Sequence, residues 1–273
     1  TTTTPGSADG FIQDTAISQG DNGGTPTKYY QTYNDYVAHA SADGTTIYVI
    51  ADSAQFLDSV TSKPGSLPTS GVRTTSYDYI SWYGSGSTLT NQVASTTVTS
   101  PEVDSGENGS GTASASKSWQ DQYGRTIWTM DANGSVNYTQ YDAATGAVTE
   151  SITDVDYSQL TGDQQDAFDL TGWSDPTGLN LVTTYAVDSQ GRTTQMTDPD
   201  GNVTHTLYDD ANHATYSFVE DSESVDGNGD GTMTTLGPIQ VSRTNVPYTY
   251  TRDSTTYTGA YDETMTMSGA VTV

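Results

Sequence analysis

Apolar and polar side chains alternate over short runs along most of the chain, and turn-forming residues separate the runs. The segments Thr27–Ser41, Gly44–Ser53 and Val72–Gly84 combine Tyr, Val, Ile and Thr between loops rich in Gly and Pro. A period of two is typical of β-strands, because successive side chains of a strand point to opposite faces of a sheet. Ile47 to Ile50 is apolar or aromatic at every position, which indicates a strand covered on both faces.

Two later segments complete the expected fold. Thr153–Asn180 lacks the alternation and contains the sequence TGDQQDAFD, for which Thr161 or Asp163 would be the N-cap. We therefore expect an insertion with at most one short helix in residues 153–180. Alternation returns in Pro247–Val273, whose last strand we expect at a sheet edge or donated to a neighbour.

The most linker-like stretch is Ser100–Ser118, which is small, polar and without periodicity. We predict an N-terminal β region over 1–105 and a Gly/Ser-rich linker or long hairpin loop over 106–118. A second β region then spans 119–273 and includes the insertion and the C-terminal strands.

Composition supports an all-β fold. Only 32% of the 273 residues are hydrophobic, and Tyr occurs 19 times against 4 Phe and 4 Trp. Tyrosine suits thin sheets because its ring packs while its hydroxyl stays in water. There is no cysteine, which excludes disulfides and thiolate metal sites.

The charge excludes several classes of partner. The chain has 8 basic and 34 acidic residues, a net charge of −26. Such a chain repels nucleic-acid phosphates and anionic lipid surfaces, and no apolar run is long enough for a membrane span. Divalent cations, basic proteins and neutral sugars remain compatible partners.

An internal repeat organises the second half of the chain. Gly124–Gly146 (GRTIWTMDANGSVNYTQYDAATG) aligns without gaps with Gly191–His213 (GRTTQMTDPDGNVTHTLYDDANH). Gly-Arg, Asp-x-x-Gly and Tyr-Asp recur in both copies at an offset of 67 residues (191 − 124 and 208 − 141). Asp-x-x-Gly predicts a turn between two strands, since Asp bonds to the backbone ahead and Gly takes a positive φ.

These two copies resemble the YD repeat of the Rhs/YD-repeat family, and Thr74–Gly84 resembles a degenerate third copy. The resemblance implies a large secreted or surface-exposed protein whose hairpins coil into a spiral, solenoid-like sheet. In Rhs and Tc toxins and in teneurins that sheet closes into a hollow shell, and the repeats are structural. This sequence departs from the family in having two clear repeats, no autoproteolytic core motif and no attached toxin domain.

We accordingly expect a non-enzymatic, extracellular or cell-surface structural protein of bacterial type. Its main expected form is a fibre, filament or matrix subunit that polymerises with itself through terminal strands such as Thr1–Gly6 and Gly269–Val273. A carbohydrate-binding or adhesion module is one alternative, and a shell segment excised from a larger toxin-carrying Rhs protein is another. A polysaccharide-degrading enzyme is the rival from the enzyme class. Because the chain begins at Thr1, we expect a processed or excised product.

The sharpest candidate site is the segment VDGNGDGTMTTLG. Side chains of Asp226, Asn228 and Asp230 alternate along a Gly-rich loop, and Thr232 follows with a backbone carbonyl. Alternating oxygen ligands on a tight loop are what Ca²⁺ requires. Gly237 stands where an EF-hand has its Glu, so the prediction is a calcium site outside the EF-hand class, which Asp221 or Glu223 could complete.

No other catalytic arrangement stands out. The three histidines are His39, His205 and His213, and His205 takes the repeat position of Tyr138, which indicates packing. There is no G-x-S-x-G elbow, phosphate loop or dinucleotide fingerprint. A platform of exposed aromatic rings that binds sugars is the alternative to packing for five aromatic residues: Trp82, Tyr83, Trp119, Trp128 and Trp173.

Overall fold

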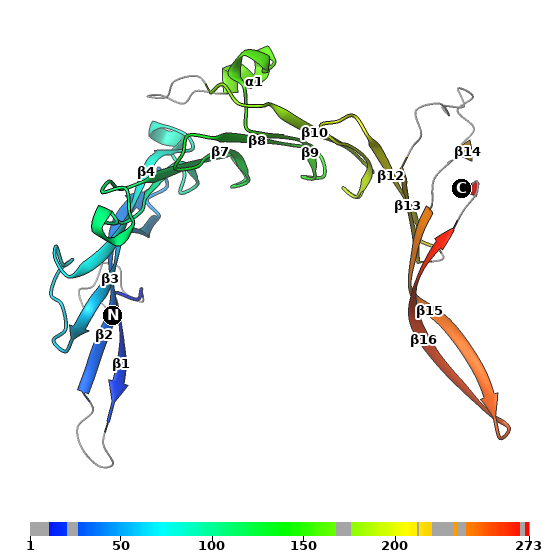
Figure 1. Cartoon of the computed structure of the whole chain (residues 1–273), viewed down its shortest axis with the longest axis horizontal. Coiled ribbons are helices and arrows are strands. Elements are labelled where there is room, and N and C mark those ends of the chain that lie inside the picture. Colours follow the sequence, from blue (N-terminus) through cyan, green and yellow to red (C-terminus); the bar gives the residue numbers. More distant parts are fainter. Residues whose placement is uncertain are drawn as a thin grey trace. The chain divides into compact units, whose positions relative to one another are not determined.

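The computed structural model describes residues 11–20, 27–167, 176–211, 213–219, 232–233, 239–267 and 271–272. Fifteen strands form one antiparallel sheet whose spatial order follows the chain, from β1 to β13 and then β15 and β16 (Figure 1). Strands β14 and β17 form a separate two-stranded sheet. The prediction of an all-β fold built from successive antiparallel hairpins is confirmed.

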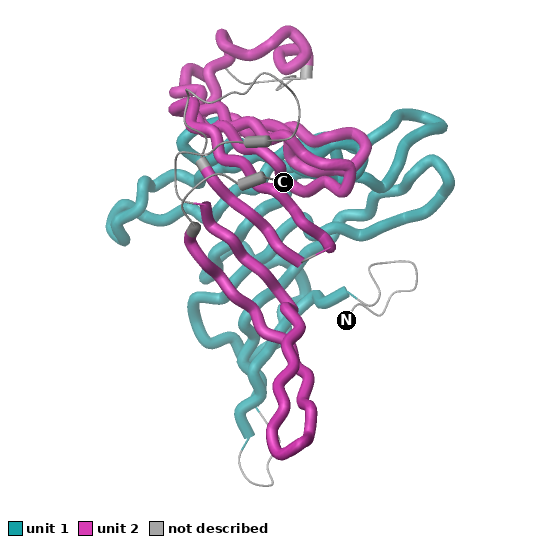
Figure 2. The backbone as a smooth tube through the Cα atoms, turned by 90° about the vertical axis from the view of Figure 1, so that its right-hand side faces the viewer, with its two compact units in different colours: residues 1–136 teal, residues 137–273 magenta. Residues whose placement is uncertain are grey.

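The chain divides into two compact units, residues 1–136 and 137–273 (Figure 2). The first unit contains β1 (Asp14–Gln19), β2 (Thr27–Ala40), β3 (Thr46–Val60), β4 (Val72–Trp82), β5 (Val93–Thr99), β6 (Ala115–Gln120) and β7 (Thr126–Met130). Two single-turn 3₁₀ helices, Gly86–Thr88 and Ser105–Glu107, lie in its loops.

Strand β8 (Val136–Tyr141) starts at the last residue of the first unit and otherwise belongs to the second. The remaining strands are β9 (Val148–Thr153), β10 (Leu181–Val187), β11 (Thr193–Thr197), β12 (Val203–Asp209), β13 (Ala214–Val219), β14 (Thr232–Met233), β15 (Ile239–Arg252), β16 (Thr255–Met267) and β17 (Val271–Thr272). A 3₁₀ turn, Tyr157–Gln159, and helix α1, Gly162–Ala167, lie between β9 and β10.

Helix α1 is the only α-helix among the described residues, and it lies in the predicted insertion. Thr161 is its N-cap: the Gln164 backbone N–H donates to Thr161 Oγ1, and the Thr161 N–H donates back to Gln164 Oε1 at 2.9 Å. This reciprocal capping box satisfies two backbone donors that the first turn would leave unpaired. Of the two predicted caps, Thr161 is confirmed.

The segment expected as a linker or long loop connects two paired strands. Thr99 of β5 lies opposite Ala115 of β6, so residues 100–114 form the loop of one hairpin. Asp104 caps the 3₁₀ turn inside this loop by accepting from the Gly106 N–H at 2.7 Å. Residues 100–114 therefore have the hairpin-loop geometry, the second of the two alternatives.

The degenerate third repeat copy does not have repeat geometry. Tyr77 and Asp78 lie inside β4, where they pair with Val98 and Thr97 of β5. In the clear copies, by contrast, Tyr141 and Asp142 mark the end of a strand. The expectation for Thr74–Gly84 was wrong because a Tyr-Asp dipeptide without the preceding Asp-x-x-Gly turn specifies no strand end.

The apolar core is thin, as the composition predicts. In the second unit Phe218, Ile239 and Val241 form a buried cluster against Leu207 and Tyr216. The register puts these side chains on one face of β12, β13 and β15, since directly paired residues share a face. In the first unit the most buried side chains include Tyr33, Ala54 and Trp128. Tertiary stability therefore rests on a few positions along a largely half-exposed sheet.

Candidate functional site

Five hairpin turns share one backbone geometry: Ser41–Thr45, Asp121–Arg125, Asp131–Ser135, Asp188–Arg192 and Asp198–Asn202. In each, the N–H of the first residue donates to the carbonyl oxygen of the fifth at 2.7 to 3.0 Å. The N–H of the fourth residue, always Gly, donates to the carbonyl oxygen of the first at 2.9 to 3.1 Å. That Gly has φ between 79° and 89°, which side chains other than Gly rarely adopt. One turn design thus recurs along the sheet.

In four of the five turns an Asp carboxylate completes the loop. Oδ1 of Asp131 accepts from the N–H groups of Asn133 and Ser135, both at 2.9 Å. Oδ1 of Asp198 makes the equivalent bonds to the N–H groups of Asp200 and Asn202 at 2.9 and 2.8 Å. The same pair of bonds is present at Asp121 and Asp188. These carboxylates accept hydrogen bonds from backbone N–H groups and thereby stabilise the turns.

The Gly-Arg motif forms a second link in this design. Nε of Arg125 donates to Oδ2 of Asp121 at 2.6 Å, and Nε of Arg192 donates to Oδ2 of Asp188 at 2.7 Å. Both oxygens of each Asp are therefore engaged. The motif is better written Asp-x-x-Gly-Arg, with the Asp three residues before the Gly.

In the second copy this Arg also contacts the Tyr of the Tyr-Asp motif. The Arg192 guanidinium carbon lies 4.2 Å from the centroid of the Tyr208 ring, and the Tyr208 hydroxyl donates to the Thr193 carbonyl at 2.9 Å. Arg192 also pairs with Asp210 at 2.5 Å. Arg192, Tyr208 and Asp210 thus connect the start of β11 to the end of β12.

Hydrogen bonding lowers the pKa of several turn carboxyls. The pKa of Asp198 lies below its ordinary value because the side chain and the backbone N–H of Asn202 donate to it. The backbone N–H of Arg192 does the same for the pKa of Asp188. At Asp121 burial raises the pKa, but the backbone and guanidinium donors of Arg125 outweigh it. These groups are held in the ionised form, which suits hydrogen-bond acceptors and not general acids.

The Asp of the first Tyr-Asp motif closes the next turn. Oδ1 of Asp142 accepts from the backbone N–H and the hydroxyl of Thr145, both at 2.7 Å, and these bonds lower its pKa. Gly146 follows at φ 76°. His213 occupies the equivalent position 67 residues later (213 − 146) and keeps a positive φ of 52°. His213 therefore takes a backbone role that Gly fills in the first copy.

The predicted calcium ligands Asp226, Asn228 and Asp230 lie outside the described residues. The fourth ligand, Thr232, is in β14, where it pairs with Thr272 of β17. Within the described residues no group of three His, Asp or Glu side chains could hold a metal ion. The calcium site remains a prediction from the sequence.

The histidines take part in packing. His205 is 7% exposed and stacks on Phe218 with the ring centroids 5.3 Å apart. His39 stacks on Trp82 with centroids 3.6 Å apart, and its Nε2 lies 2.9 Å from the Thr90 carbonyl oxygen. The aromatic role expected for His205 is the one the structure shows.

The described aromatic residues considered for a sugar platform contact other side chains or the backbone. Trp128 is 1% exposed and lies opposite Trp119 in the β6–β7 register. Trp82 is covered by His39, and the Tyr83 hydroxyl donates to the Gln120 carbonyl. Trp173 lies outside the described residues.

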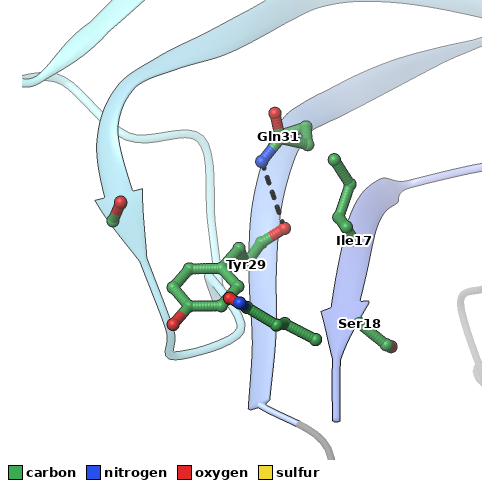
Figure 3. Close-up of a pocket in the computed structure, with 6 residues that line it drawn as sticks. Ile17, Ser18, Tyr29 and Gln31 are labelled. Atoms are coloured by element: carbon green, nitrogen blue, oxygen red, sulfur yellow. Dashed lines mark hydrogen bonds between the residues drawn. The ribbon is translucent and has the colours of Figure 1, made fainter.

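A shallow pocket of about 560 Å³ opens on the face of β1, β2 and β3 (Figure 3). Ile17 and Ser18 of β1 lie on one side of it, and Tyr29 and Gln31 of β2 on the other, with the Gln31 amide donating to the Tyr29 carbonyl at 3.3 Å. Gln19 and Ser59 complete the lining, which holds no charged group. Such a pocket can accept an apolar side chain and offers no acid, base or metal ligand.

A row of exposed tyrosines covers one face of the β15–β16 hairpin. Tyr250 and Tyr257 lie opposite each other, with near-parallel rings 5.0 Å apart, and Tyr248 lies next to Tyr250 at 6.2 Å. Tyr261 contacts Tyr248 at 5.9 Å. We call Tyr248, Tyr250, Tyr257 and Tyr261 the tyrosine face; each is 44 to 49% exposed.

Two functional features escaped the sequence reasoning. The turn role of Asp121 and Asp188 was not predicted, although each lies three residues before the Gly of its Gly-Arg and ten residues before the next turn Asp (131 − 121 and 198 − 188). The tyrosine face was visible only in part, because β16 supplies half of it through long-range pairing. A search for Asp-x-x-Gly at ten-residue spacing would have found the first feature.

The fold and these sites define an all-β protein of successive antiparallel hairpins joined by Asp-capped turns. None of the helices described has the length and hydrophobicity to cross a lipid bilayer. No protein-family model matches the sequence, and no curated protein matches it.

Solved structures of TcdB2–TccC3 are similar to the chain. The form without the hypervariable C-terminal region is 13% identical, with a TM-score of 0.37, over 84% of this chain and 11% of that one. A second structure, of TcdB2–TccC3, is 13% identical, with a TM-score of 0.25, over 84% of this chain and 13% of that one. TcdB2–TccC3–Cdc42 is 12% identical, with a TM-score of 0.23, over 90% and 16%. The chain spans 11 to 16% of the length of these chains.

Proposed function

We propose that the chain is a structural wall segment of a larger extracellular β-sheet shell of the YD-repeat type. The observation that carries the proposal is the combination of chain-order strand pairing with one recurring Asp-capped turn. A sheet of this kind is extended by adding further hairpins at either end, as repeat proteins are extended by adding units.

The edges and the faces of the sheet favour a larger assembly. Among the described residues nothing pairs with the outer edge of β1 or of β16. A sheet normally buries one face against another layer, and here most side chains of the described strands remain partly exposed. Further protein on these edges and faces would supply the missing cover.

A structural and non-enzymatic role fits the chemistry of the turns. The repeated Asp carboxylates accept backbone N–H groups, and the described histidines stack on other rings or take a turn position. The filament reading is less well supported: Thr1–Gly6 lies outside the described residues, and Val271–Thr272 of the expected donor segment pairs with β14 of the same chain.

The test is to isolate the native protein from its source with antibodies to the β6–β9 region. We expect a polypeptide well above 28.9 kDa, or an assembly containing it, that appears as hollow particles in electron micrographs. A native protein that is a compact 28.9 kDa species, with no associated chains, would contradict the shell proposal.

A further inference from the structure

The distal half of the β15–β16 hairpin is a two-stranded ribbon. Strand β13 pairs with β15 only as far as Arg243, and the β15–β16 register continues past a bulge from Val246 opposite Tyr261 to the tip (Figure 1). Asp253 and Ser254 form that tip with φ of 51° and 64°, a two-residue turn that favours a regular hairpin. We call residues 246–261 the ribbon.

The ribbon has only two strands over its whole length, because β13 does not reach it. A two-stranded hairpin alone is marginally stable in water, and a third or fourth strand with an apolar face is what stabilises it. One face of this ribbon is the tyrosine face, and the other consists of small residues, with Thr249 opposite Thr258 and Pro247 opposite Ala260. Gly259 leaves room for the Tyr248 ring, since a Cβ there would lie 2.8 Å from that ring.

The outer edge of β16 lacks the usual protection against strand pairing. Thr255–Tyr261 reads TTYTGAY, without charge or proline, and its register with β15 has no bulge. In natural proteins a charged side chain, a proline or a β-bulge normally prevents an edge strand from pairing with another chain. At the other end of the sheet β1 is short, and its Asp14 pairs with Lys63 at 2.9 Å.

Tyr257 and Tyr261 lie at equal distances in sequence on the two sides of Gly259. Two antiparallel copies related by a two-fold axis at Gly259 would place Tyr257 of each opposite Tyr261 of the other. The same register puts Asp262 opposite Thr256 and Glu263 opposite Thr255, so no two acidic side chains meet. The tyrosine faces of both copies then lie on the same side, because pairing about an axis perpendicular to the sheet preserves its faces.

We propose that β16 pairs with β16 of a second copy of this chain, with Gly259 on the two-fold axis, to form a four-stranded ribbon with eight tyrosines on one face. The contact is closed, since each β16 has one outer edge, and it yields a dimer and not a filament. It goes beyond the proposed shell function and uses only the ribbon part of the β16 edge, which projects past β13, so in a shell the further hairpins would be added at the β1 end of the sheet.

Each copy carries a net charge of −26, so salt should favour the dimer. Light scattering of the purified chain should show a monomer–dimer equilibrium that shifts toward dimer between about 0.1 M and about 1 M NaCl, where the Debye length falls from about 10 to about 3 Å. Tyr257→Asp should weaken dimerisation about tenfold or more, because both cross-axis aromatic pairs are lost. Tyr123→Asp, at a 70% exposed turn position in the first unit, is the matched control and should still dimerise.

Disulfide trapping tests the register itself, because the natural chain has no cysteine. Thr258→Cys with Ala260→Cys places two thiols opposite each other across the axis and should give a covalent dimer on mild oxidation. Thr256→Cys with Ala260→Cys uses the same face in the wrong register and should not. A chain that stays monomeric at high salt, a species larger than a dimer, or equal trapping of both variants would overturn the proposal. A native particle that is not a shell would leave this result unaffected.

Discussion

The guanidinium of Arg192 lies 4.2 Å from the centre of the Tyr208 ring, and the two residues belong to the Gly-Arg and Tyr-Asp ends of one repeat copy. The contact gives the motif a physical reason, because the cation covers an aromatic face and also bonds to Asp188 and Asp210. In this copy the contact links the start of β11 to the end of β12.

Replacing Arg192 with Met should lower the free energy of unfolding by about 1 kcal/mol. The cation–π contact supplies about 0.5–1 kcal/mol of this, and the exposed ion pairs add little. Urea unfolding followed by tryptophan fluorescence measures the difference. Arg73→Met is the control, since Arg73 pairs only at the surface with Glu107, and its loss should cost less than about 0.5 kcal/mol. Equal losses for both variants would contradict the role given to Arg192.

Gly201→Ala should destabilise the protein through the backbone alone. Gly201 has φ of 86°, and no atom lies within 4 Å of where a Cβ would be. The expected loss is about 1 kcal/mol, and Gly201→Asn should lose less because Asn tolerates this conformation better. Gly65→Ala meets equally open space without a positive φ, so its midpoint of thermal unfolding should not fall. If Gly65→Ala were as harmful, the positive φ of Gly201 would not be the cause of the loss.

Stability should fall in acid as the turn carboxyls protonate. The pKa values of Asp142, Asp188 and Asp198 are lower in the folded state, so their contribution is present above the unfolded pKa of about 3.9. It is lost as the pH falls below about 4 through the folded values. Protonation also lowers the repulsion among the many carboxylates of the chain, which raises stability in acid. The effect of one turn carboxyl must therefore be measured as the difference in stability between wild type and a variant at each pH.

The matched variant for this experiment is Asp198→Asn, which keeps the shape but cannot titrate. Its urea midpoint should be lower than wild type at pH 7, and the difference should shrink toward pH 3. Asp200→Asn is the control, because the Asp200 carboxyl makes none of the turn bonds that Asp198 makes. A difference between wild type and Asp198→Asn that grows in acid would show the sign to be wrong.

Calcium should raise the thermal unfolding midpoint of the wild-type chain, and chelation should reverse the shift. A ligand that binds only the folded state stabilises it by mass action. The double variant Asp226→Asn with Asp230→Asn should lose the response, whereas Asp198→Asn should keep it. Magnesium at the same concentration separates a calcium site from general screening of the negative charge.

Local patterns predicted the parts of the fold that local chemistry specifies. Asp131 and Gly134 predict their turn because the Asp side chain and the glycine φ act within five residues. Thr161 predicts the start of α1 for the same reason. Each of these features is complete within a short segment, so no knowledge of the tertiary fold is needed.

The tyrosine face and the β14–β17 pair, which the sequence did not predict, depend on pairing between distant segments. The tyrosine face requires Tyr257 and Tyr261 to return beside Tyr248, and the length of the β15–β16 hairpin decides whether they do. The β14–β17 pair joins residues 40 apart (272 − 232), and strands of two residues carry no usable periodicity. Likewise Tyr77 and Asp78 resemble a repeat end in sequence and yet lie inside a strand.

Strand order that follows chain order also has a consequence for synthesis. Nearly every strand of the large sheet pairs with the strand made just before it, so most native contacts close short loops, and low contact order favours rapid folding. Each hairpin can form on the edge of the part already folded as the chain leaves the ribosome. Among the described strands β14 must wait for its partner, since β17 emerges only after the whole of β15 and β16.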